Sequence, residues 1–186
     1  GACDWSSDVC SSDLLRLATD PLEALRGEHP RQRTMVRDLE RIADEPGPPG
    51  PGTEAALRAK LDRAAPVHRR DVEGDLLPLL RRRAVPEDAV EALIARLARE
   101  HAACAARARA ISPALARLAE GGPAPGGEER ATMRALAAAE LRRLTLENAV
   151  MLPLARARLT GADLRTLALR MAARRGICLI PERGPC

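Results

Sequence analysis

The sequence predicts an all-α protein, an up-down-up-down four-helix bundle followed by a short fifth helix. Three observations predict it. Strong helix formers such as Ala, Leu, Arg and Glu are abundant among the 186 residues, whereas β-branched residues are sparse. Apolar residues recur at helical spacing along four long segments, and Gly- and Pro-rich stretches separate these segments. A chain of this length can bury one substantial core.

The first helix is expected to begin at Asp20 and to run to about Ala43. Asp20 is the N-cap, Pro21 takes the first helical position and Glu23 completes a capping box. Pro30 lies inside this helix and should kink it. The apolar side that we expect to be buried consists of Leu22, Leu25, His29, Val36, Leu39 and Ile42.

The second helix follows a Gly- and Pro-rich linker at 46–52, which is a strong turn signal. Thr53 is its expected cap, and the helix should end near Arg83. Pro66 and Pro78 fall inside the segment, so we expect each of them to break or bend it.

Three further helices complete the predicted bundle. The third begins at Pro86, bends at 112–113 and ends before the Gly pair 121–122, and the fourth runs from about Glu128 to Arg158. A capping box at 160–163 starts the short fifth helix, and cationic residues followed by Gly176 end it. The predicted domain is therefore 15–176, with 177–186 as an unassigned tail. Residues 1–14 resemble the translation of a sequencing-library adapter, so we exclude this leader from the fold.

Charge and cysteine content restrict the possible partners. The net charge of +4 comes from Arg residues interspersed with acids, with no aromatic residues among them for base stacking, so we expect no nucleic-acid binding. No apolar run is long enough to cross a bilayer, so we expect no membrane partner. The five Cys are odd in number and lack zinc-ligand spacing, which is typical of reduced thiols in the cytoplasm.

One polar residue stands on the apolar side of each long helix. They are His29, His68, His101 and Glu147. His68 and Glu147 belong to two stretches that align at a constant offset, and each stretch has half of a His-x-x-x-Glu motif. Val72 stands where the first stretch would have the Glu, and Arg143 stands where the second would have the His. An ionised buried carboxylate is costly unless it is paired. Two explanations remain open: the four residues converge on a metal, or Arg143 pairs with Glu147 in a satisfied core.

Several stretches of the sequence also resemble a known family. They are Asp20 to Leu22 with Glu28-His29; His68 with Asp71 and the run 75–80; Glu100-His101 with the two alanines after it; Glu147 to Thr160; and 171–176. On these residues the chain from about 20 to 176 resembles the hemerythrin-like family, also called the HHE cation-binding domain. The resemblance implies a four-helix bundle around a non-haem iron centre, usually di-iron. It also implies binding of dioxygen, or a response to oxygen, nitric oxide or iron.

The resemblance assigns ligand positions and reveals two departures. The matching positions are His29, His68, His101 and Glu147. Val72 stands where the family has a bridging Glu, and Arg143 where it has a His. Asp71 and Asp75, three and seven residues after His68, are the candidate replacement ligands, and Asp71 is the more plausible of the two. Glu73 is expected to be a solvated acid. Arg143 should oppose a second cation and favour a bound anion.

We therefore expect a depleted, mono- or dinuclear iron site that binds or senses a small diatomic molecule. The alternative is a degenerate, metal-free bundle that acts as a protein-interaction module. We do not expect an enzyme, because the site has too few carboxylates for a di-iron oxidase and the sequence has no nucleophile–base pair, phosphate loop or dinucleotide fingerprint.

Overall fold

A computed structural model describes residues 17–45, 52–177 and 179 of the chain. All regular structure in this described part is helical, which confirms the predicted all-α class. None of its helices combines the length and the apolar character that a membrane crossing needs. The leader at 1–14 and most of the 46–52 linker and of the tail lie outside the described residues.

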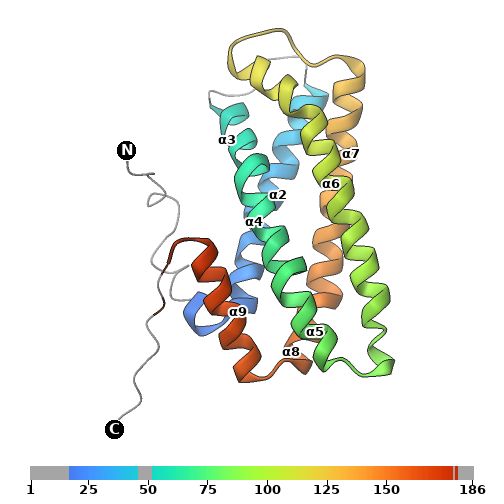
Figure 1. Cartoon of the computed structure of the whole chain (residues 1–186). Helices are drawn as coiled ribbons and strands as arrows, with labels where there is room; N and C mark the ends of the chain where they lie inside the picture. The colour runs from blue at the N-terminus through green and yellow to red at the C-terminus, as the bar shows by residue number, and fades with distance from the viewer. Residues whose placement is uncertain (1–16, 46–51, 178, 180–186) are drawn as a thin grey trace.

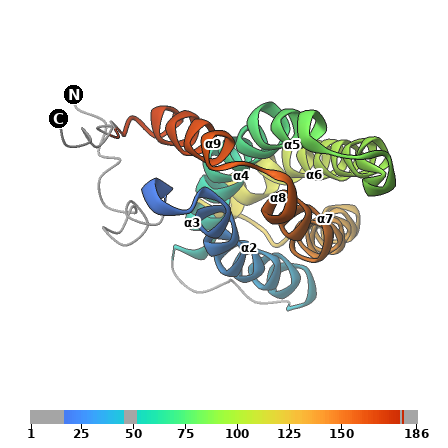
Figure 2. The same ribbon diagram turned by 90° about the horizontal axis from the view of Figure 1, so that it is seen from below.

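Four rods lie side by side, and successive rods are joined at alternate ends (Figure 1). The helix α9 lies outside them, next to the rod that contains α4 (Figure 2). The first rod is α2 (Pro21–Asp44), and the second joins α3 (Thr53–Ala59), η1 (Lys60–Ala64), α4 (Ala65–Arg70), η2 (Asp71–Leu76) and α5 (Leu77–Arg83). The third rod is α6 (Val90–Ala119), the fourth joins α7 (Gly127–Leu146), η4 (Glu147–Met151) and α8 (Leu152–Arg158), and α9 spans Gly161–Arg174.

The start of α2 follows the predicted capping chemistry in part. Asp20 is the N-cap, and its Oδ1 accepts the backbone N–H groups of Leu22 and Glu23 at 3.1 Å. The Glu23 carboxylate does not complete a capping box but contacts Arg26 and Arg156 instead. The first turn is therefore held by one cap residue together with the surface ion pairs around it.

The other helix ends follow the predicted sequence signals in some cases and depart from them in others. Thr160 and Asp163 form the predicted capping box of α9, and Gly176 adopts the left-handed conformation with φ 68° just after that helix. Gly52, not the predicted Thr53, is the N-cap of the second rod; Thr53 is the first helical residue, and its Oγ1 accepts from Arg41 at 3.4 Å. The third rod begins at Val90, because residues 86–88 form a separate 3₁₀ turn.

The prolines do not break the rods. Immediately before Pro66, Pro78 and Pro153 the backbone forms the π-helical segments η1, η2 and η4, in which the residue preceding each proline donates to the carbonyl five residues earlier. The wider turn relieves the clash between the proline ring and the preceding turn, so the helix continues. Pro30 and Pro113 lie inside α2 and α6, which run on through them.

The buried residues form two apolar clusters with a polar layer between them. One cluster includes Leu25, Leu76, Leu97 and Met151. The other includes Leu39, Leu61, Ile111 and Leu136. Along each rod, the predicted polar residue lies between a residue of one cluster and a residue of the other. The fold therefore places four polar side chains at a similar level of the interior.

Candidate metal centre

Glu147 is the centre of the polar layer. It is completely buried at the start of η4, and one imidazole nitrogen from each of the other three rods points at its carboxylate. His29 Nε2 lies 3.0 Å and His68 Nε2 3.1 Å from Oε2, while His101 Nε2 lies 3.2 Å from Oε1. The structure thus brings together all four residues that the sequence places on the apolar sides of the rods.

The outer nitrogen of each imidazole also has a partner, and each partner atom is an oxygen. The pairs, each with an Nδ1–O distance of 2.9 Å, are His29 with Asn148, His68 with Glu28 and His101 with Glu73. The Asn148 amide nitrogen donates to the Leu144 carbonyl, which leaves its oxygen to accept from His29. All three rings therefore donate from Nδ1 and turn Nε2 inward, where it can carry a proton or bind a metal ion.

This arrangement suits a metal ion. Histidine ligands usually donate their outer N–H to a carboxylate or carbonyl oxygen, and the bond fixes the tautomer that binds metal. Three inward Nε2 atoms that face a carboxylate need positive charge between them, either a metal ion or protons. The buried His29 Nε2 has no hydrogen-bond partner despite its proximity to Glu147. Ligand atoms of His29, His68 and Glu147 lie within 4.8 Å of one another, as one ion would require.

Arg143 also contacts the Glu147 carboxylate. Its Nη1 donates to Glu147 Oε1 at 2.7 Å and lies 3.2 Å from His68 Nε2. Nε and Nη2 donate to Glu140 at 3.2 and 2.5 Å, and Nη2 also donates to Gln32 at 2.9 Å. The expected attraction for an anion is not supported, because all three guanidinium nitrogens have partners and two carboxylates balance the charge. Its charge beside Oε1 still opposes a second cation there.

Burial and neighbouring charge act in opposite directions on the ionisation of this layer. Burial would raise the pKa of Glu147, but the charges of His68 and Arg143 outweigh it and hold that pKa well below 4.5. Burial would lower the pKa of His68, yet the charge and hydrogen bond of Glu147 and the hydrogen bond of Glu28 raise it from 6.5 to about 9. Without a metal, His68 is therefore cationic at neutral pH, with protons on both Nδ1 and Nε2.

The raised pKa of His68 predicts how the stability of the metal-free chain changes with pH. Protonated His68 stabilises the folded state fully below pH 6.5, and this contribution is lost as the pH rises to about 9. Metal affinity should rise over the same window, because Nε2 must lose its proton to become a ligand. Urea unfolding of the chelator-treated chain should show the declining free energy of unfolding, and His68→Gln should flatten it. A free energy that increases across this window contradicts the assignment.

The candidate replacement ligands lie elsewhere. The Asp71 carboxylate contacts Arg174 and Arg175, and that of Asp75 contacts Arg170 and Arg174, so the structure corrects their expected role. Asp71 is the first residue of η2, and the ion pairs that hold its carboxylate come from the end of α9. Val72 is fully buried in an apolar cluster and adds no donor.

The outer partners of the cluster were not identified from the sequence. Glu73, expected to be a solvated acid, is hydrogen-bonded to His101, and its side chain is 36% exposed. Three other partners lie close in sequence to residues of the cluster, which could have indicated them. Glu28 and Asn148 adjoin His29 and Glu147, and Glu140 is three residues before Arg143, on the same helical face. Adjacency alone does not show that a side chain turns toward a ring.

A cavity of about 270 Å³ reaches the cluster between the second rod and α6. His68, His101, Cys104, Glu140 and Arg143 line its inner part. Burial, with the negative charge of Glu140, raises the pKa of the Cys104 thiol to about 12, so this thiol stays protonated. A small molecule could therefore approach two of the imidazoles without meeting a thiolate.

Comparison with known proteins gives one finding. A model of the Hemerythrin HHE cation binding domain matches residues 20–155, which include all four rods up to the first half of α8. No curated protein and no solved structure matches the chain.

Proposed function

Because the chain belongs to the hemerythrin HHE cation-binding family, we propose that it binds one iron ion and, through it, a small diatomic molecule such as dioxygen or nitric oxide. The observation that supports this proposal best is the set of three oxygen acceptors on the outer nitrogens of His29, His68 and His101. In a metal-free core the three rings need not all donate from the outer nitrogen, whereas a set of metal ligands requires it.

His29, His68 and the Oε2 atom of Glu147 would hold the ion, with His101 facing the other carboxylate oxygen. Imidazole and carboxylate donors suit iron, manganese and zinc alike, and the choice of iron follows the family. Ferrous iron with so few protein ligands would supply open coordination positions and an electron. The protein contributes fixed imidazoles, a buried carboxylate and the adjacent cavity.

A second function is favoured by a different observation. Arg143 already supplies a cation to Glu147 at 2.7 Å, so the carboxylate is paired even without a metal. A metal-free bundle could then serve as a protein-interaction module. The two functions differ in one measurable property, the metal content of the purified chain.

Metal analysis after anaerobic loading with ferrous iron tests the proposal. We expect about one ion per chain in the wild type and almost none in a His29→Ala, His68→Ala double variant, because two of the three converging donors are gone. Asp88→Ala is the control, since it removes a carboxylate that pairs with Arg158 outside the cluster and away from α9. A wild-type chain without iron, or a double variant that retains it, contradicts the proposal.

A further inference from the structure

We propose that α9 helps to position a ligand of the metal centre, because Arg175 at its C-terminal end orients Glu28 and Glu28 fixes the orientation of the His68 ring. The inference rests on the proposed metal binding and extends it to a helix beyond the residues that the family model matches. Arg175 is here a positioning residue that acts on the ligand through another side chain.

A continuous chain of contacts links α9 to the ligand. Arg175 Nη2 donates to Glu28 Oε1 at 2.8 Å, and the other oxygen of Glu28 lies 2.9 Å from His68 Nδ1. Each oxygen of this carboxylate thus has one specific partner. Arg175 is itself held, because Nη2 also donates to Asp71 at 2.6 Å and Nη1 donates to the Met171 carbonyl at 3.0 Å.

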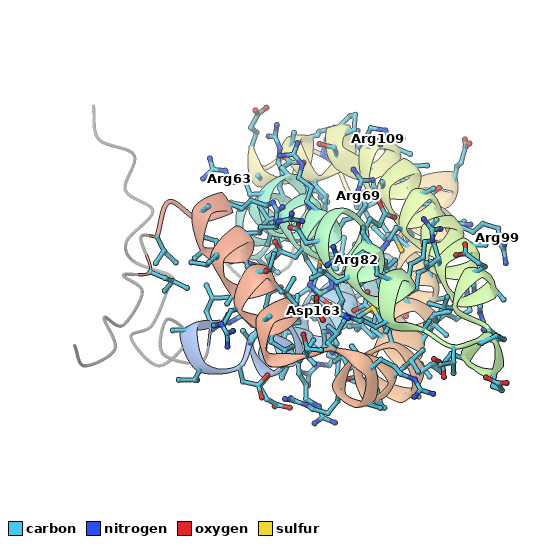
Figure 3. All side chains as sticks on the ribbon, turned by 60° about the horizontal axis from the view of Figure 1, so that its bottom comes forward. Arg63, Arg69, Arg82, Arg99, Arg109 and Asp163 are labelled. Atoms are coloured by element: carbon cyan, nitrogen blue, oxygen red, sulfur yellow. The ribbon has the colours of Figure 1, made fainter. Side chains whose placement is uncertain are left out.

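The position of α9 is fixed along its length. It packs against α2 and η2, and its Leu167 and Met171 are fully buried in the same apolar cluster as Val72. In its first turn Asp163 accepts hydrogen bonds from Arg83 at 2.8 Å and from Arg82 at 3.3 Å. Arg82 and Asp163 are labelled in Figure 3. Arg175 therefore reaches Glu28 from a helix that is anchored near both ends.

The coupling follows from how outer partners act on metal ligands. A carboxylate on the outer nitrogen orients the ring and raises its basicity, and loss of such a partner typically lowers metal affinity by about 10–100-fold. Glu28 is a quarter exposed, so without Arg175 its side chain would be free to turn toward solvent. By reciprocity, a metal bound at His68 should strengthen the docking of α9 by the same factor.

Three variants test the inference by competition of ferrous iron with a chelator under anaerobic conditions. Arg175→Met should lower the iron affinity about tenfold, and Glu28→Gln by at least as much. The double variant should lose no more than Glu28→Gln alone, because the two residues act in series. Arg174→Met is the matched control: Arg174 also binds Asp71 but does not touch Glu28, so its variant should keep wild-type affinity.

Hydrogen exchange gives a second readout that does not depend on whether Arg175→Met folds. Iron should slow exchange of the α9 amides in the wild type, and Glu28→Gln should abolish that effect. Equal affinities in Arg175→Met and Arg174→Met, or α9 exchange that iron leaves unchanged, would overturn the inference while the proposed function stands. A wild-type chain that binds no iron at all would overturn both.

Discussion

Replacing Glu147 by Gln should abolish metal binding and destabilise the fold more than any other single change in the cluster. Glu147 is the one group that all three imidazoles and Arg143 share. The amide removes the buried negative charge but keeps the shape, so Arg143 retains only Glu140 as an anionic partner. Breaking a buried ion pair in this way typically costs about 3–5 kcal/mol. Urea unfolding and metal analysis measure the two effects.

Glu73→Gln is the control for this prediction. Glu73 also contacts an imidazole of the cluster, but its side chain is partly exposed, so water can replace much of what is lost. We expect a change of no more than about 1 kcal/mol in the free energy of unfolding. If the Glu147 and Glu73 variants lose similar stability, or if the Glu147 variant keeps its metal, Glu147 is not the hub of the site.

The second large effect is a gain of metal. Arg143→His combined with Val72→Glu should raise the iron content from about one to about two ions per chain. The double change removes the guanidinium charge beside Glu147 Oε1 and supplies an imidazole and a carboxylate. Val72 is fully buried among apolar residues, so the new Glu should also make folding dependent on metal. Elemental analysis and thermal unfolding with and without iron provide the measurements.

Arg143→Met separates the effect of losing the guanidinium charge from the effect of gaining new metal ligands. It removes the opposing charge but adds no ligand, so its iron content should stay at about one ion. A double variant that holds the same amount as the parent would show that Arg143 and Val72 do not limit nuclearity. A parent without iron whose double variant binds it would support the metal-free function instead.

Local periodicity was enough to predict the helices and the polar residue on each rod. His29, His68, His101 and Glu147 each interrupt an apolar side, and that pattern requires no knowledge of the partner rods. The prolines were harder, because proline in a helix normally means a break. Whether a π-helical turn absorbs it depends on packing that the sequence does not display.

Long-range side-chain contacts account for the rest. Asp71 lies three residues after His68, so spacing alone makes it a plausible ligand, yet its carboxylate is held by Arg174 and Arg175 from the end of α9. Glu73 was expected in solvent but reaches His101 on another rod. Helical spacing describes one rod at a time, and it gives no information on contacts between rods.

Anomalous diffraction at the iron absorption edge, from crystals of the iron-loaded chain, tests the metal centre most directly. We expect one peak per chain, bounded by Nε2 of His29, Nε2 of His68 and the carboxylate of Glu147. A peak only among exposed carboxylates, or no peak in a fully loaded sample, would contradict the account.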